Sequence, residues 1–200
     1  GNLSAYRLLE SKMFHLTKTL GYPRNKNEEE KYRVLIHEPI LQSVQRAKSF
    51  WAKFHYYNIL NFYYDAIGNK EKLYQTRKQL IDFAETEPQK IEDDRLRYLV
   101  ALNNLVNTQD ELDKTEEVKE TLKKIRNVKS KNIDVQIKVF VYSYTLEESA
   151  NLMRGLFKKN IEHLPEVEKG LKKFKGKMHP EYLMAFQYNF FYSFFGVGDY

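Results

Sequence analysis

Apolar residues recur at intervals of three and four along most of the chain, and few helix-breaking residues interrupt them. The 200 residues include only 8 Gly and 5 Pro. Intervals of three and four place side chains on one face of an α-helix, whereas a half-buried strand needs strict alternation. The pattern therefore predicts an all-α protein of about nine helices.

Stop signals divide the chain into these helices. Segment 4–20 ends at Gly21, and an aromatic-rich segment over 49–67 ends at Gly68-Asn69. The turn at Gly68-Asn69 is so short that the helices before and after it must pack antiparallel. Further helical segments are predicted over 93–107, 133–154, 156–174 and from Pro180 onward.

Three residues give local expectations about helix ends. Pro39 lacks an N–H donor and should kink or split the second helical segment. Asp113, with Glu116 three residues later, is typical of a capping box at a helix start. Pro165 lies inside the amphipathic segment 156–174 and predicts a bend there or a break near residue 164.

Composition limits the environment and the chemistry of the chain. There is no cysteine, which excludes disulfides, thiolate catalysis and cysteine-based zinc sites. This composition is compatible with a reducing cytoplasm, where we expect the protein to be located. No apolar run approaches the ~20 residues of a membrane-spanning helix, so no membrane partner is expected.

No residue pattern points to catalysis, a cofactor or a metal. The five histidines lack the spacing of metal-binding motifs, and neither a phosphate-binding loop nor a nucleophile motif is present. The acidic clusters 28–30 and 92–94 stand at predicted helix starts, where carboxylates complement the helix dipole. We therefore expect a non-enzyme without cofactors or metal ions.

An aromatic helix containing Tyr57, Leu60 and Tyr64 ends in a turn at Gly68-Asn69. Similar turns occur at Gly155-Leu156-Phe157 and, after another aromatic helix, at Gly198-Asp199-Tyr200. On these features residues 50–200 resemble the tetratricopeptide repeat family, whose unit is a helix–turn–helix of about 34 residues and whose first helix has aromatic, Leu and Tyr positions that Tyr57, Leu60 and Tyr64 match. Units that resemble repeats cover 54–88, 141–175 and 184–200, with a degenerate unit over 95–128.

The resemblance implies a right-handed superhelix of antiparallel helix pairs, that is, an α-solenoid. Residues 1–48 would be additional or capping helices. Residues 49–200 would be the repeats, truncated after the first helix of the last unit, so that the natural protein is expected to continue. Such a fold implies a protein–protein interaction scaffold that holds a peptide or helix in its concave groove.

In this family the first helix of each repeat lines the groove, which implies a set of partner-binding residues. Their alternative role is packing in the core or between helices. The implied groove residues are His55, Asn58, Phe62 and Asp65, then Tyr142, Thr145 and Ser149, and finally Tyr188 and Tyr192.

Two other functions remain as alternatives. The net charge is +6, and segments 114–131 and 158–177 are rich in lysine, so the chain could be a basic nucleic-acid-binding helical protein. It could also be a sensor or regulatory segment of a larger protein. In addition, the phenylalanine-rich helix 184–195 is expected to leave apolar side chains exposed, which predicts self-association through this end.

Overall fold

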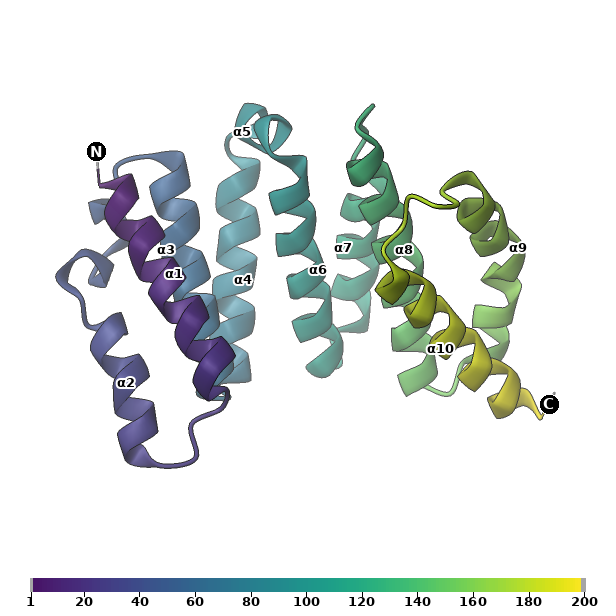
Figure 1. Cartoon of the computed structure of the whole chain (residues 1–200), viewed down its shortest axis with the longest axis horizontal. Coiled ribbons are helices and arrows are strands. Elements are labelled where there is room, and N and C mark those ends of the chain that lie inside the picture. Colours follow the sequence, from purple (N-terminus) through teal and green to yellow (C-terminus); the bar gives the residue numbers. More distant parts are fainter. Residues whose placement is uncertain (1, 199–200) are drawn as a thin grey trace. The chain divides into compact units, whose positions relative to one another are not determined.

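The computed structural model describes residues 2–198, and in that range every regular element is a helix. The all-α prediction is confirmed, with ten α-helices instead of about nine. Residues 199 and 200 of the predicted last turn lie outside the described residues. The α-helices are α1 (Leu3–Leu20), α2 (Lys26–Ile36), α3 (Phe50–Ala66), α4 (Lys70–Glu85), α5 (Pro88–Asp93), α6 (Arg95–Glu111), α7 (Thr115–Asn127), α8 (Ile133–Met153), α9 (Phe157–Lys173) and α10 (Pro180–Val197) (Figure 1).

The chain forms two compact units, which divide between Asp94 and Arg95. Unit 1 contains α1 to α5, and unit 2 contains α6 to α10. The predicted additional helices of residues 1–48 therefore belong to the same compact unit as α3 and α4. The reason is that α1 packs along α3 as extensively as α3 packs on its hairpin partner α4.

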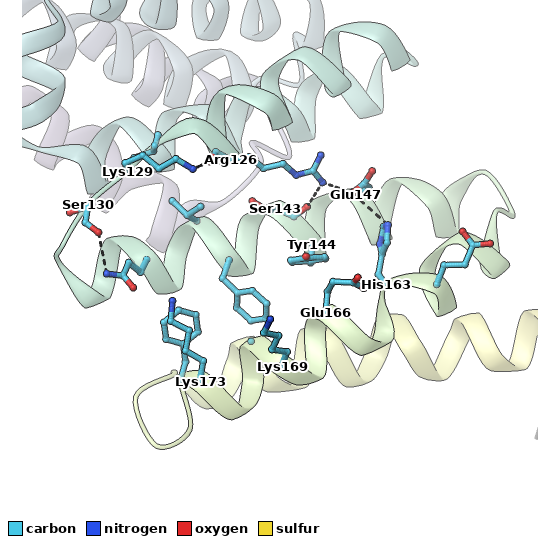
Figure 2. A pocket seen from close by; sticks show the side chains of 17 residues that line it. Arg126, Lys129, Ser130, Ser143, Tyr144, Glu147, His163, Glu166, Lys169 and Lys173 are labelled. Atoms are coloured by element: carbon cyan, nitrogen blue, oxygen red, sulfur yellow. Dashed lines mark hydrogen bonds and ion pairs between the residues drawn. The ribbon is translucent and has the colours of Figure 1, made fainter.

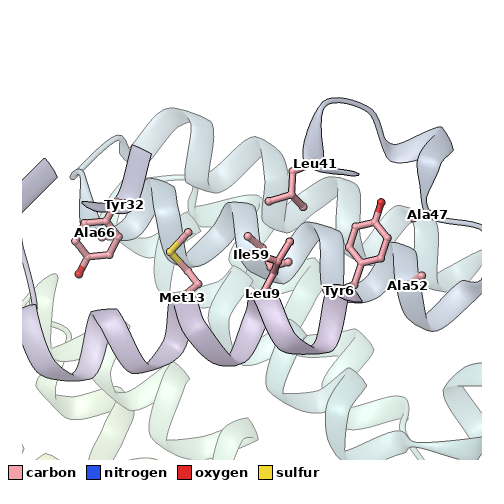
Figure 3. Packing of buried hydrophobic residues seen from close by; sticks show 9 residues of the cluster. All are labelled: Tyr6, Leu9, Met13, Tyr32, Leu41, Ala47, Ala52, Ile59 and Ala66. Atoms are coloured by element: carbon pink, nitrogen blue, oxygen red, sulfur yellow. The ribbon is translucent and has the colours of Figure 1, made fainter. Parts of the chain in front are cut away.

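A continuous apolar core holds α1 to α3 of unit 1 together (Figure 3). Tyr6, Met13 and Ile59 are fully buried in it. The hydroxyl of Tyr6 donates to the carbonyl of Ile40 at 2.7 Å, and the hydroxyl of Tyr32 donates to the carbonyl of Gly21 at 2.6 Å. Buried tyrosines thus fill the core and also satisfy backbone carbonyls of the loops that connect the helices.

Short polar residues begin several helices, as their side-chain oxygens suit helix N-termini. Asn25 accepts from the backbone of Glu28, and Ser49 accepts from the backbone of Ala52. The cap predicted at Asp113 is wrong, because Lys114 precedes α7 without a side-chain cap bond. Asp113 has a φ of 54°, and the following N–H bonds back to Gln109 at 2.8 Å, so this residue ends α6 instead.

Prolines shape three of the helical segments. The second segment stops at Ile36, and Pro39 opens a separate short 3₁₀ segment, Pro39–Leu41. Pro180 occupies the first turn of α10. Of the two outcomes expected at Pro165, the break near residue 164 does not occur, because α9 runs through Pro165 as one helix; the bend stays a prediction.

Unit 2 contains two helical hairpins followed by a single helix. Helices α6 and α7 form the first hairpin and α8 and α9 the second, and α10 packs on both α8 and α9. Helix α8 contacts all four of the other helices of the unit. A core that includes Val141, Val167 and Phe186 joins α8, α9 and α10.

None of the described helices combines the length and the apolar character needed to cross a membrane.

Candidate functional site

Most of the groove residues expected on α3 are packed against another helix. His55 is buried, and its Nδ1 contacts a carboxylate oxygen of Glu10 in α1. The side-chain amide of Asn58 donates to the other oxygen of the same carboxylate at 2.9 Å. Glu10 therefore joins α1 to α3 through two polar contacts, and the surface on which a peptide was expected is covered there.

Two further residues of the predicted set on α3 have different environments. Phe62 stacks edge-on against Phe14 of α1, with ring centroids 5.8 Å apart. Asp65 is exposed near the end of α3. In unit 1 the alternative role, packing between helices, thus describes three of the four predicted residues.

The predicted residues of unit 2 lie on α8 and α10. Lys138 donates to the hydroxyls of Tyr142 and Tyr182, at 3.1 and 3.3 Å, and so joins α8 to the start of α10. Thr145 donates to the carbonyl of Val141 at 2.8 Å, which occupies its hydroxyl within α8. Ser149, Tyr188 and Tyr192 are exposed. In unit 2 the exposed members of the predicted set thus lie on two different helices, and their role in binding a partner stays a prediction.

A large open groove occurs on a different face of α8. Its volume is about 1010 Å³, and it is bounded by the end of α7, the 128–132 loop, α8 and α9 (Figure 2). The lining residues are Arg126, Val128, Lys129, Ser130, Gln136, Val139, Phe140, Ser143, Tyr144, Glu147, Glu162, His163, Glu166, Lys169, Gly170, Lys173 and Phe174. We call this cavity the α7–α9 groove.

Aromatic side chains form the floor of the α7–α9 groove. Phe140 packs between Tyr144, Phe174 and Phe186, with ring centroids 5.3 to 5.6 Å apart. A Cβ added at Gly170 would overlap the Phe140 ring, so glycine is what allows α9 to lie directly against this ring. The close approach fixes the position of the aromatic floor relative to the α9 wall.

An ion pair crosses the groove wall from α7 to α8. The guanidinium of Arg126 binds the carboxylate of Glu147 and donates to the carbonyl of Ser143 at 3.2 Å. His163 of α9 stands edge-on to Tyr144, with ring centroids 5.8 Å apart, and its Nε2 lies 4.0 Å from a Glu147 oxygen. Helices α7, α8 and α9 thus each contribute a polar side chain to this end of the groove, and the contacts among these side chains hold them in place.

Lysines line one end of the groove, and the other end holds the Arg126–Glu147 ion pair together with His163 and further carboxylates. Lys129 and Lys173 lie near the 128–132 loop, whereas Glu147 and His163 lie at the other end (Figure 2). On the α9 wall, the residues that face the groove change from acidic to basic toward the C-terminal end of the helix. The order along α9 is Glu162, His163, Glu166, Lys169 and Lys173.

Tyr144 supplies a hydrogen-bond donor to the middle of the groove. Burial raises the pKa of its hydroxyl, nearby carboxylates led by Glu166 raise this pKa further, and Arg126 lowers it. The phenol therefore keeps its proton at neutral pH. Together with the aromatic floor, it suits a ligand that has both apolar and hydrogen-bonding groups.

A second polar cluster lies on the side of α8 that faces α9 and α10. Glu148 is fully buried, and Asn189 donates to its carboxyl at 3.2 Å. Burial raises the pKa of Glu148 to about 8, against the opposing effect of the bond from Asn189. Asn160 links the same helices by donating to the carbonyl of Glu148 at 2.9 Å and to Ser193 at 3.1 Å.

Sequence reasoning missed the α7–α9 groove because its walls are polar and were assigned to exposed helix faces. One signal could have indicated it, namely Gly170 in the interior of an otherwise good helix. Glycine costs about 1 kcal/mol relative to alanine in such a position, so it often marks a close approach.

In residues 2–198, no three His, Asp or Glu side chains come together as a metal site would require. Comparisons of the chain with protein-family models, with curated proteins and with solved structures found no match. The fold and the groove define only a general class: an all-helical protein with an open groove lined by both acidic and basic side chains.

Proposed function

We propose that this chain is a non-catalytic helical-repeat scaffold, of the tetratricopeptide-like kind, that binds a peptide segment of a partner protein in the α7–α9 groove. The observation that carries the proposal is the groove itself. Its aromatic floor offers apolar contact, and its charged walls offer complementary contacts to a peptide side chain of either sign.

The size of the groove supports a short peptide as the ligand. Its floor extends along α8 from Gln136 to Glu147. At 1.5 Å per residue this is about 17 Å, which accommodates three turns of a helix or about five extended residues. A segment with basic side chains at one end, acidic side chains at the other and an apolar residue between them would match the groove.

Packing within unit 2 supports the repeat assignment. Its two hairpins follow one another, and the first helix of the second hairpin packs on both helices of the first. Successive hairpins, however, start at Phe50, Arg95 and Ile133, at intervals longer than the roughly 34 residues of the family. The repeats would therefore be degenerate in length as well as in sequence.

The non-catalytic character rests on the state of the polar groups in the groove. The carboxylate of Glu147 is engaged by Arg126, and the nearest histidine nitrogen is 4.0 Å away, beyond hydrogen-bonding distance. Such an arrangement stabilises the groove wall and does not present a base beside a nucleophile. The cytoplasm remains the proposed location, since the chain has no cysteine.

A charge exchange within the groove tests the proposal. Random peptides displayed on phage would be selected on the wild-type chain, and the affinity of the selected peptides would be measured by fluorescence anisotropy. Glu166→Lys combined with Lys169→Glu keeps the net charge but reverses two groove-facing charges. We expect this variant to bind the selected peptides about tenfold or more weakly, a loss of at least about 1.4 kcal/mol.

The matched control exchanges two charges on the outer face of the same helix. Glu168→Lys combined with Lys172→Glu alters exposed residues that do not line the groove, and affinity should stay unchanged. Equal weakening in both double variants would contradict peptide binding in the groove. So would selective binding of single-stranded oligonucleotides with a steep loss of affinity on added salt, which would support the nucleic-acid alternative.

A further inference from the structure

The last helix of unit 2 has an apolar stripe on its exposed side. Met184, Tyr188 and Phe191 follow one another at intervals of four and three residues, and Phe195 continues the series. Their exposed fractions are 64%, 59%, 66% and 62%, respectively. Large exposed apolar patches are uncommon on monomeric proteins and commonly mark interaction surfaces.

This stripe is separate from the side of α10 that builds the core. Phe186, Phe190 and Ser193 are buried and face α8 and α9, whereas the stripe lies on the other side of the helix. A helix that is apolar on both sides requires contacts on both. The core of unit 2 accounts for only one of them.

The spacing of the stripe is that of a helix–helix seam. Alternation of four and three residues is the pattern with which two helices interlock their side chains. In such pairs, charged residues beside the seam select the partner. Here the flanking residues Ala185, Gln187, Tyr192 and Phe194 are uncharged, and no charged residue occurs from Tyr182 to Val197.

The absence of charge favours an identical helix as the partner. Two copies of a chain with a net charge of +6 repel one another, and they can approach most closely where each surface is neutral. The uncharged flanks provide no selection for a partner of opposite charge. A two-fold pair of identical stripes would place apolar residues against apolar residues throughout.

The area of the stripe is sufficient for a weak but specific dimer. A large side chain presents about 200 Å², so the exposed parts of the stripe and of Tyr192 amount to roughly 600 Å² per copy. Two copies would bury about 1,200 Å², at the lower limit for specific interfaces. We propose that this face of α10 pairs with the same face of a second copy of the chain.

The test is the mass of the full chain in solution as a function of concentration. Sedimentation velocity from micromolar to near-millimolar concentration should show the mass rising from 24.0 kDa toward twice this value. Phe191→Glu introduces a charge at the centre of the stripe and should keep the chain monomeric over the whole range. Its far-UV circular dichroism and melting temperature should match the wild type, because this side chain lies outside the core.

A matched control distinguishes the stripe from general surface hydrophobicity. Leu8→Glu alters an exposed apolar residue of α1, 57% exposed, and should dimerise like the wild type. Should Phe191→Glu fold poorly, Met184→Glu provides the same test about two helical turns away in the same stripe. A wild-type chain that remains monomeric, or a Phe191→Glu variant that still dimerises, would overturn the proposal. A monomer that co-sediments with phosphatidylcholine vesicles through Phe191 would replace it with a lipid surface.

Discussion

Glu148 shows how the surroundings of a single residue alter its chemistry. It is one of two adjacent glutamates in α8, yet it is fully buried beside Asn189, while Glu147 pairs with Arg126 at the groove. A buried carboxyl keeps its proton because ionisation without water is costly. At neutral pH the two neighbours therefore differ in charge, a difference that no sequence pattern could have indicated.

Unit 2 should lose stability as the pH rises because of Glu148. Its folded pKa of about 8 exceeds the ordinary value of 4.5. Between these values the folded chain holds a proton that the unfolded chain has released, so the free energy of unfolding falls through this window and levels off above pH 8. Glu148→Gln cannot ionise and should be more stable than the wild type at pH 8.5, by on the order of a few kcal/mol, and nearly equal at pH 4.5.

Urea unfolding followed by circular dichroism at several pH values measures this difference. The exposed Glu162→Gln serves as the control and should retain the pH dependence of the wild type. If Glu148→Gln also retains it, the carboxyl is already ionised in the folded chain and the assigned direction is wrong.

At the scale of single elements, the close approach of two helices determines which residue a helix position tolerates more strongly than helix propensity does. Gly196 lies near the end of α10, and an added Cβ would come within 2.5 Å of Cγ in Phe157. That atom is at the base of the ring, so the ring cannot yield by a small rotation. The glycine allows Phe157 of α9 to lie directly against the end of α10.

Replacement of Gly196 by alanine should therefore destabilise unit 2. Alanine favours a helix by up to about 1 kcal/mol, but overpacking costs about 1–3 kcal/mol. We expect a net loss of roughly 1 kcal/mol in the free energy of unfolding, measured by urea denaturation. Gln187→Ala, at an exposed position of the same helix, should change stability by no more than about 0.5 kcal/mol. A Gly196→Ala chain as stable as this control would mean that Phe157 moves freely.

Helix positions were predictable from local signals, and the site was not. The segments that became α1, α3 and α8 were evident from their spacing and from Gly21, Gly68 and Gly155, which all adopt positive φ. Which face of a helix stays open depends on distant residues. Nothing near His55 in the sequence indicates that Glu10 would cover it, because that contact spans 45 residues.

At the scale of the whole molecule, each of the two compact units contains an apolar cluster of its own. The core around Tyr6 and Ile59 lies within unit 1, and the core around Val141 and Phe186 lies within unit 2. We predict that the two compact units unfold in separate transitions. The single tryptophan, Trp51, makes this testable, since it lies in α3 of unit 1 and its fluorescence follows the unfolding of that helix.

The Gly196→Ala chain should therefore show a divided response. Its tryptophan fluorescence should follow the unfolding curve of the wild type, while circular dichroism, which detects both units, should show part of the helix lost at lower urea concentration. A matching variant in unit 1 is Ile59→Ala, which removes most of a fully buried side chain. It should lower the free energy of unfolding reported by tryptophan fluorescence by about 2–5 kcal/mol. Equal shifts of both signals in Gly196→Ala would show that the two units unfold as one.

The opposed neighbours Glu147 and Glu148 also have a consequence for folding accuracy. A helix turns by about 100° per residue, so a slip of α8 by one position in one direction would carry Glu147 into the place of Glu148 and leave Leu146 opposite Arg126. Arg126 would then lack its carboxylate partner, and the displaced carboxylate would enter the dry contact with α9 and α10. Breaking an ion pair and burying one of its charges carries a large electrostatic cost, so the two adjacent glutamates select against this misalignment of the central helix of unit 2.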